Sequence, residues 1–368
     1  MGQRKKKLKR ILISLPLLLA LIALIPAAVY MFGEAGTDGL QKAPDAQSSG
    51  LPNEETSGSP EESFPDFLDG ISPAGNNSVS DESETDIFTL FDLSAGETVQ
   101  VSRNELIPAA IACEMDLSAP REALKAQAVA CYTLFSRKRA AGEAITCDSE
   151  NWQVWVPEDR MRERWGEDFE SNLAVLRETA DQVAGQLLEW EGAPILAAYF
   201  AISSGATESS KNVWGGELPY LQAVASPGDC FSSGYLSTVT LSPEEFRNAA
   251  EIDAETPPDL SGDPKDWLTD IVTTPSGYVR SASLGGVNVS GVDLRSAFSL
   301  RSACFQVEYD GENFQFTVEG WGHGVGMSQA GAAYLAKRGK TYREILSYYY
   351  PGTILTYPDE RPTGGTGS

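Results

Sequence analysis

The chain has 368 residues, 52 of them acidic and 28 basic, and a formal net charge of −24. This excess of negative charge argues against nucleic acid as a partner, because a phosphate backbone would be repelled. It also excludes long-range attraction to any acidic polymer, so binding to such a polymer would depend on stacking and hydrogen bonds.

The N-terminus has the pattern of a membrane anchor. Residues 1–10 contain six basic residues and no acid, and residues 11–32 are uncharged for 22 positions. That length spans a bilayer, and flanking Lys and Arg keep the N-terminal end in the cytoplasm. We therefore predict a cytoplasmic basic segment at 1–10 and a single-pass transmembrane anchor at 11–32, with the remainder outside the cytoplasm at the cell membrane. A weak small-residue pattern near Ala27 leaves open a cleaved signal peptide.

Residues 33–86 are rich in Gly, Pro, Ser, Asp and Glu, and Lys42 is their only basic residue. Few apolar residues and like-signed charge predict a disordered acidic linker. The Gly/Thr-rich end, 358–368, is predicted to be a disordered tail. Residues 87–357 then form one folded domain of the α+β class, with helices packed on short, mostly antiparallel sheets.

Two helices are predicted early in this domain. Ser102 and Glu105 form a capping-box pattern that starts the first helix, and Pro108 implies a kink or a later start. Pro120 opens the second helix, which buries a stripe spaced four, three and four residues apart. That stripe consists of Leu124, Ala128, Cys131 and Phe135.

Glu114 ends the first of these helices and shares a face with Ile107 and Ile111. A carboxyl group on an apolar face is costly to ionise, so its pKa should rise, as a general acid near neutral pH requires. The alternative is a salt-bridged or solvent-facing glutamate at a helix end.

Downstream, we expect helix at 158–184, a hairpin at 187–200 and a polar loop at 202–221. Gly320, Gly322, Gly324 and Gly326 alternate with other residues. In an extended strand they would leave one bare face, which a ligand or another backbone could approach closely. A helix follows from about Ser328 to Arg338.

His323 lies among these glycines and is the only histidine in the chain. A hydrogen-bonded structural role and a role in a cleft both fit its position. Five cysteines, an odd number in an exported chain, leave at least one thiol free.

Five segments together resemble the stage II sporulation protein D family, in that family's order and over about residues 87–357. They read EMDLSAPREALKAQAVA, CDSENWQV, SSGATESSKNVWGGELPYLQAV, VSGVDLRSAFSLRSACFQV and GWGHGVGMSQAGAAYLAKRGKTYREILSYYYPGT. The resemblance implies a membrane-anchored lytic transglycosylase that cuts peptidoglycan glycan strands during endospore engulfment. It further implies a partner amidase that strips the stem peptides, and a membrane scaffold of the engulfment machinery.

Glu114 falls on the family's catalytic acid. A lytic transglycosylase lets the muramic acid 6-hydroxyl attack the anomeric carbon, so one carboxyl suffices where ordinary glycosidases use two. Asp116 and Glu208 would be spare acids. The residues predicted to bind sugar are Ser204, Thr207, Glu208, Trp321 and His323.

The sequence departs from the family at three places. Tyr132 replaces an arginine that would face the cleft, and Ala201 replaces a frequent histidine. Asn151 and Trp152 replace a His-Cys pair of a possible zinc site, which leaves Cys147 alone, so we expect no cofactor and no zinc. The alternative function is a non-catalytic, peptidoglycan-binding amidase enhancer.

Overall fold

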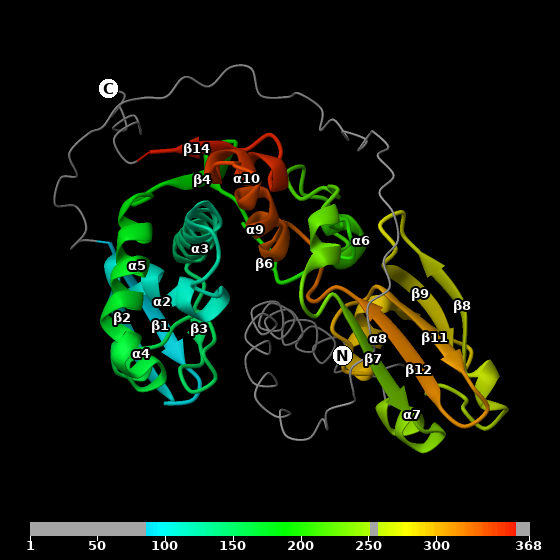
Figure 1. Ribbon diagram of the computed structural model, residues 1–368. Helices are drawn as coiled ribbons and strands as arrows, with labels where there is room; N and C mark the ends of the chain where they lie inside the picture. Colours follow the sequence, from blue (N-terminus) through cyan, green and yellow to red (C-terminus); the bar gives the residue numbers. More distant parts are fainter. Residues whose placement is uncertain (1–85, 251–256, 358–368) are drawn as a thin grey trace, which may run out of the picture.

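The computed structural model describes residues 86–250 and 257–357. They form two lobes side by side (Figure 1). The core of the helical lobe comes from residues 88–221 and 325–350, and the core of the β lobe from residues 246–318. The chain passes between the lobes near residues 232–235 and 320–324, so the glycine-rich segment lies at the junction.

The helical lobe contains two three-stranded sheets, a two-stranded parallel pair and most of the helices. In the first sheet, β1 pairs antiparallel with β2 and parallel with β3; the second has the antiparallel order β14-β4-β5, and β13 pairs with β6. The strands are β1 (Ile87–Asp92), β2 (Glu97–Ser102), β3 (Ile145–Cys147), β4 (Leu187–Trp190), β5 (Ala193–Pro194), β6 (Tyr199–Phe200), β13 (Met327–Ser328) and β14 (Ile354–Thr356). The helices are α2 (Arg103–Glu114), α3 (Arg121–Ala140), α4 (Glu158–Trp165), η3 (Gly166–Asp168), α5 (Phe169–Asp181), α6 (Ser210–Trp214), η4 (Pro227–Phe231), α9 (Gln329–Lys337) and α10 (Tyr342–Tyr349).

The β lobe has two antiparallel three-stranded sheets, of order β11-β12-β7 and β10-β9-β8. Its elements are β7 (Leu236–Leu241), α7 (Pro243–Ala249), η5 (Pro264–Asp266), β8 (Leu268–Thr273), β9 (Val279–Leu284), β10 (Val287–Ser290), α8 (Gly291–Ala297), β11 (Phe305–Tyr309) and β12 (Phe314–Glu319). The predicted α+β class with short, mostly antiparallel sheets is confirmed.

Local sequence signals place the helix starts correctly. The capping box of Ser102 and Glu105 is present, and α2 continues through Pro108. Pro120 is the N-cap of α3, and the four residues of the predicted stripe are all buried. The predicted helix at 158–184 is interrupted, because Gly166 has a positive φ of 53° after α4.

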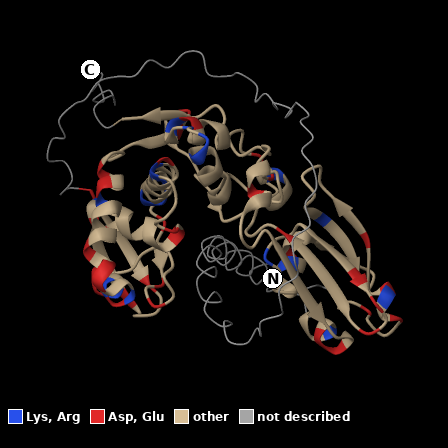
Figure 2. Ribbon diagram, in the orientation of Figure 1, with Lys and Arg blue, Asp and Glu red and all other residues tan. Residues whose placement is uncertain are grey.

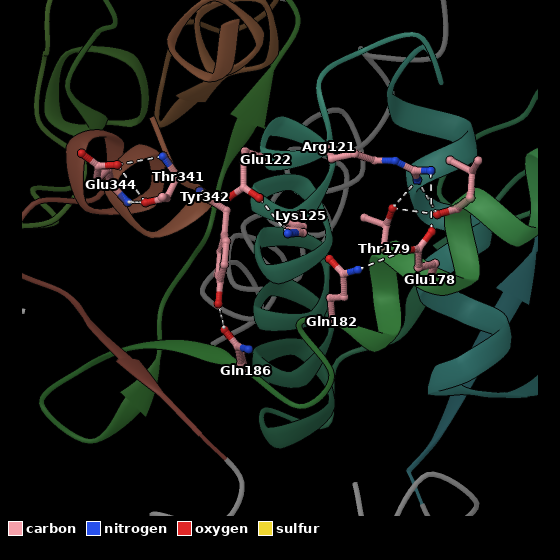
Figure 3. Close-up of polar contacts among 11 residues, drawn as sticks. Arg121, Glu122, Lys125, Glu178, Thr179, Gln182, Gln186, Thr341, Tyr342 and Glu344 are labelled. Carbon is pink, nitrogen blue, oxygen red and sulfur yellow. Dashed lines mark hydrogen bonds and ion pairs between the residues drawn. The ribbon is translucent and has the colours of Figure 1, made fainter. Parts of the chain in front are cut away.

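Helix α3 runs through the helical lobe and contacts α2, α5, α9 and α10. Figure 3 shows how polar side chains fix two of these contacts. Glu122 on α3 accepts a 2.7 Å hydrogen bond from the backbone N–H of Tyr342, the first residue of α10. On the other side of α3, Arg121 donates to the Thr179 hydroxyl of α5 at 3.0 Å. Since α10 follows α9 directly, these bonds also limit how α9 can lie on α3.

The prediction of an extended strand at Gly320–Gly326 is wrong. All four glycines have positive φ values, between 77° and 123°, so the backbone turns repeatedly instead of extending. Close backbone approach does occur: a Cβ on Gly326 would lie 2.0 Å from the carbonyl oxygen of Ala198, and one on Gly320 would lie 2.7 Å from that of Ile202. The space that a side chain would take at Gly320 and Gly326 is therefore occupied by backbone atoms of the same protein.

All five cysteines are free thiols, and only Cys230 is exposed. Within residues 86–250 and 257–357, no helix is both long enough and apolar enough to cross a membrane. The basic segment at 1–10, the anchor at 11–32, the linker up to residue 85 and the tail at 358–368 lie outside the described residues.

Candidate active site

Glu114 is the last residue of α2, and the helix itself disfavours its ionised form. The C-terminal end of a helix carries partial negative charge from unpaired carbonyl groups, and the last turn of α2 has no basic residue to offset it. The residue is half-buried as a whole, but its Oε2 atom is buried and has no hydrogen-bond partner among the described residues. An unpaired buried carboxylate oxygen is costly, so the protonated form is favoured.

Two polar side chains contact this carboxyl group and two more bond to those, and we call the four the polar shell. The shell is Gln127 and Cys131 of α3, Tyr199 of β6 and Gln329 of α9. Gln329 Nε2 donates to Gln127 Oε1 at 3.4 Å, Gln127 Nε2 donates to Cys131 Sγ at 3.3 Å, and Cys131 Sγ donates to Tyr199 Oη at 3.5 Å. All four side chains are buried.

The surroundings of the shell contain few charges. Residues 195–207 and 320–336 include no Asp, Glu, Lys or Arg, so β6, β13 and α9 up to its last residue, Lys337, are tan in Figure 2. Burial raises the pKa of Glu114 to about 8, while polar contacts with Gln329 and Tyr199 act in the opposite direction. The direction agrees with the sequence prediction: Glu114 holds its proton at neutral pH.

His323 and Glu114 both contact Tyr199, His323 at the Tyr199 backbone and Glu114 at the Tyr199 side chain. The His323 ring lies between Phe200 and Trp214, with centroids at 5.5 and 5.4 Å. Burial of the ring, with the nearby charge of Arg295, lowers the pKa of His323 to about 3. The imidazole is therefore neutral at physiological pH.

Ser204, on the segment that follows β6, and Trp321, on the glycine-rich segment that follows β12, lie at the junction of the lobes. Trp321 exchanges backbone hydrogen bonds with Ile202, of 2.7 and 3.0 Å, and the guanidinium of Arg301 is 4.0 Å from its ring centroid. The Ser204 hydroxyl donates to the Ser276 carbonyl at 3.1 Å. Both residues are half-buried. Whether they bind sugar stays a prediction.

Thr207 and Glu208 have no accessible side chain in this structure, with exposed fractions of 0% and 1%. The Thr207 hydroxyl accepts from the Val224 N–H at 2.9 Å and donates to the Gln222 carbonyl at 3.4 Å. Glu208 Oε1 accepts from the Ser209 N–H and from Asn212, at 2.7 and 2.8 Å. These bonds give both residues a structural role in the loop beside the glycine-rich segment.

The residues at the family's possible zinc position do not fit a zinc ion. Cys147 is buried in β3, where its Sγ lies 3.7 Å from the Phe91 carbonyl oxygen, and burial raises its pKa to about 12. The Asn151 side chain is bound to Asp148 at 2.8 Å, and the described residues contain no cluster of three metal-ligating side chains.

Tyr132 does not face Glu114. Its hydroxyl donates to Asp86 just before β1, and its ring packs edge-on against Phe88 at 6.1 Å. The replaced arginine position therefore belongs to the contact between α3 and β1. A hollow of about 380 Å³ lies on the outer side of the sheet that contains β1. It is lined among others by Ile87, Phe91 and Arg139, and it includes no candidate site residue.

Sequence reasoning missed Gln127, Tyr199, Gln329 and the buried Asp229. A signal was present for the two glutamines, because each interrupts a run of small apolar residues on a helix. A buried amide must find hydrogen-bond partners, so such a position indicates a polar contact inside the core. Which partner it meets depends on the tertiary fold.

A carboxyl group that burial keeps protonated, in contact with an uncharged polar shell within a two-lobed α+β domain, defines a protein with a candidate acid site. A family model described as stage II sporulation protein matches residues 94–188. Stage II sporulation protein D of Bacillus amyloliquefaciens is 34% identical over 263 residues, covering 69% of this chain and 74% of that protein. The protein of the same name from Bacillus subtilis (strain 168) is 31% identical over 277 residues, covering 72% and 78%. An amidase enhancer of Bacillus subtilis is 29% identical over 294 residues, covering 66% of this chain and 39% of that protein. The chain belongs to the stage II sporulation protein D family.

Proposed function

We propose that this protein is a membrane-anchored lytic transglycosylase, which cleaves peptidoglycan glycan strands stripped of stem peptides during endospore engulfment. Membership of the family and similarity to an amidase enhancer support a role at the cell wall in sporulation. The observation that carries the catalytic part is Glu114, whose pKa is raised to about 8 by burial beside a shell of uncharged groups.

Glu114 would act first as an acid and then as a base. Its proton goes to the glycosidic oxygen between muramic acid and the next sugar as the bond from the anomeric carbon to that oxygen breaks. The 6-hydroxyl of the same muramic acid forms the new bond to the anomeric carbon, and its proton passes to the Glu114 carboxylate. The products are a 1,6-anhydro-muramic end and a free hydroxyl, and Glu114 is again protonated.

The spare acids have unsuitable surroundings for this acid step. Asp116 is exposed, and hydrogen bonds from Ser118 lower the pKa of its carboxyl, so it is ionised at neutral pH. Glu208 is buried away from solvent by its own loop. A mechanism with one carboxyl therefore depends on Glu114 alone.

Sugar binding would rest on Trp321 and Ser204 at the junction of the lobes, by ring stacking and hydrogen bonding. Neutral His323 would support this segment through its ring contacts. In the cell, we propose that the protein acts outside the cytoplasm, held at the membrane by residues 11–32, with an amidase that removes stem peptides and a membrane scaffold as partners.

The alternative is a non-catalytic amidase enhancer, favoured by the similarity to a protein of that name. In that case Glu114 would be a buried structural acid. The protein would bind wall glycan and raise the rate at which an amidase releases stem peptides, without cutting the glycan.

The test is digestion of peptide-free glycan by the full-length chain, with mass spectrometry of the ends. Wild type should form anhydro-muramic ends, Glu114→Gln should form none, and Glu170→Gln should match wild type. Glu170 is a suitable control because it is a surface acid paired with Arg162, with 76% of its side chain exposed. If wild type forms no anhydro ends but speeds peptide release by an added amidase, the enhancer function is correct and the catalytic one is wrong.

A further inference from the structure

Asp229 is a fully buried carboxylate beneath the N-terminus of α9. Its Oδ2 accepts hydrogen bonds from the Ser203 N–H at 2.7 Å and from the Ser328 hydroxyl at 2.6 Å, and its Oδ1 accepts from the Ser226 hydroxyl at 3.0 Å. Among the described residues, no Lys, Arg or His forms an ion pair with it. A buried charge without a cation is costly, and burial raises the pKa of the Asp229 carboxyl, while the three donors act in the opposite direction. The positive end of the α9 dipole also favours the carboxylate.

Through these bonds Asp229 fixes the first turn of α9. Ser328 is the N-cap, and its hydroxyl, while donating to Asp229, accepts from the Gly331 N–H at 3.1 Å. A Cβ on Gly331 would lie 2.0 Å from the Tyr349 hydroxyl, so the turn packs closely against α10. Position and rotation of the first turn are therefore both restricted.

Gln329 is the first residue of that turn and directly follows Ser328. Its side chain is 7% exposed and lies between Gln127 of α3 and the carboxyl group of Glu114. An amide carries both donors and an acceptor, so it can accept from a protonated carboxyl and donate to an ionised one. Gln329 can thus contact Glu114 in both protonation states that acid and then base chemistry requires.

We propose that Gln329 is a positioning residue for Glu114, held in place by the contact between Asp229 and Ser328. The proposal rests on the proposed function for its kinetic consequence, but the contact itself can be measured independently of activity. The chemistry depends on the direction in which Glu114 presents its proton, and small misplacements of a catalytic group reduce turnover strongly.

The kinetic test uses Gln329→Ala in the full-length chain, on peptide-free glycan. We expect kcat to fall by about ten- to a hundred-fold with KM changed less than about three-fold, because Gln329 would act on the acid and not on the sugar. Gln182→Ala removes an exposed glutamine from the end of α5 (Figure 3) and should leave both constants unchanged. If the fall in kcat is accompanied by a fall in thermal stability and the pH profile of kcat is unchanged, Gln329 is only a structural residue.

The second readout is the titration of the Glu114 carboxyl, followed by NMR of carboxyl-labelled glutamate and assigned with Glu114→Gln. Because the contact with Gln329 lowers the pKa of Glu114, Gln329→Ala should move the midpoint to higher pH. Ser328→Ala should move it in the same direction, while Ser328→Thr, which keeps the hydroxyl, should not. Unmoved midpoints in Gln329→Ala and Ser328→Ala overturn the proposal even if glycan is cleaved; moved midpoints without cleavage overturn the proposed function alone.

Discussion

The Nδ1 atom of His323 accepts a 3.1 Å hydrogen bond from the backbone N–H of Val325. An accepting Nδ1 cannot carry a proton, so the imidazole is neutral and its hydrogen lies on Nε2, from where it reaches the backbone of Tyr199. This histidine therefore orders the glycine-rich segment and does not exchange protons with a substrate near neutral pH.

We predict that His323 shows no titration between pH 5 and pH 8. As the only histidine in the chain, its ring signals in a proton NMR spectrum are easily recognised. The pKa is lowered to about 3 in the folded protein, so the folded state disfavours the charged form. The contribution of His323 to the free energy of unfolding is then fully present above its unfolded pKa of about 6.5 and is lost as pH falls below that value. A midpoint near 6.5 in the folded protein would show that the surroundings of the ring do not disfavour its charged form.

A second prediction concerns the stability of Glu114→Gln. The folded pKa of Glu114 is raised to about 8, so folding favours the protonated acid. The contribution of Glu114 to the free energy of unfolding is complete below its unfolded pKa of about 4.3 and is lost as pH rises toward 8. Glutamine cannot ionise, so the variant should gain stability relative to wild type as pH rises from 5 to 8, by at most about 4 kcal/mol over these three pH units at about 1.4 kcal/mol per unit.

Urea denaturation of both proteins at several pH values measures this gain. Glu170→Gln at the surface should show no pH-dependent difference from wild type. An equal stability difference between wild type and Glu114→Gln at pH 5 and pH 8 would mean that Glu114 is ionised in the folded protein throughout.

Sequence predicted the helices around the site because their signals are local. Ser102 and Pro120, the two predicted start signals, each precede a helix that begins at the next residue. Glu114 could be singled out for the same reason, since its apolar neighbours belong to its own helix. These features depend on contacts within one or two turns.

The polar shell could not be predicted in this way. Gln127 and Gln329 are 202 residues apart, and Cys131 and Tyr199 are 68 apart, so only the tertiary fold brings them to Glu114. The alternation of glycines from Gly320 indicated close approach correctly. It did not indicate positive φ values, because small residues fit both a bare strand face and a series of turns.

Tyr132→Phe should weaken the contact between α3 and β1 without changing Glu114. The variant loses the hydroxyl that donates to Asp86, which costs about 1.5–3 kcal/mol for one partly buried hydrogen bond to a charged group. The control is Tyr309→Phe, because the Tyr309 hydroxyl is exposed where it donates to the Gly311 carbonyl at 3.0 Å. Its loss should lower the free energy of unfolding by less. The free energy of unfolding and the Glu114 titration are measured together; a shifted Glu114 midpoint in Tyr132→Phe would bring Tyr132 into the active site after all.

Gly331→Ala tests how closely the first turn of α9 packs against its surroundings. The new Cβ would lie 2.0 Å from the Tyr349 hydroxyl and 2.3 Å from that of Ser226, and these two hydroxyls already bond to each other at 2.7 Å. Overpacking of this kind costs about 1–3 kcal/mol. Gly216→Ala is the control, because nothing lies within 4 Å of its Cβ position. Removing the obstructing hydroxyl in Gly331→Ala/Tyr349→Phe should recover part of the loss, so the two substitutions should not be additive. Strict additivity would show that α9 shifts away from Tyr349, which would also move Gln329 relative to Glu114.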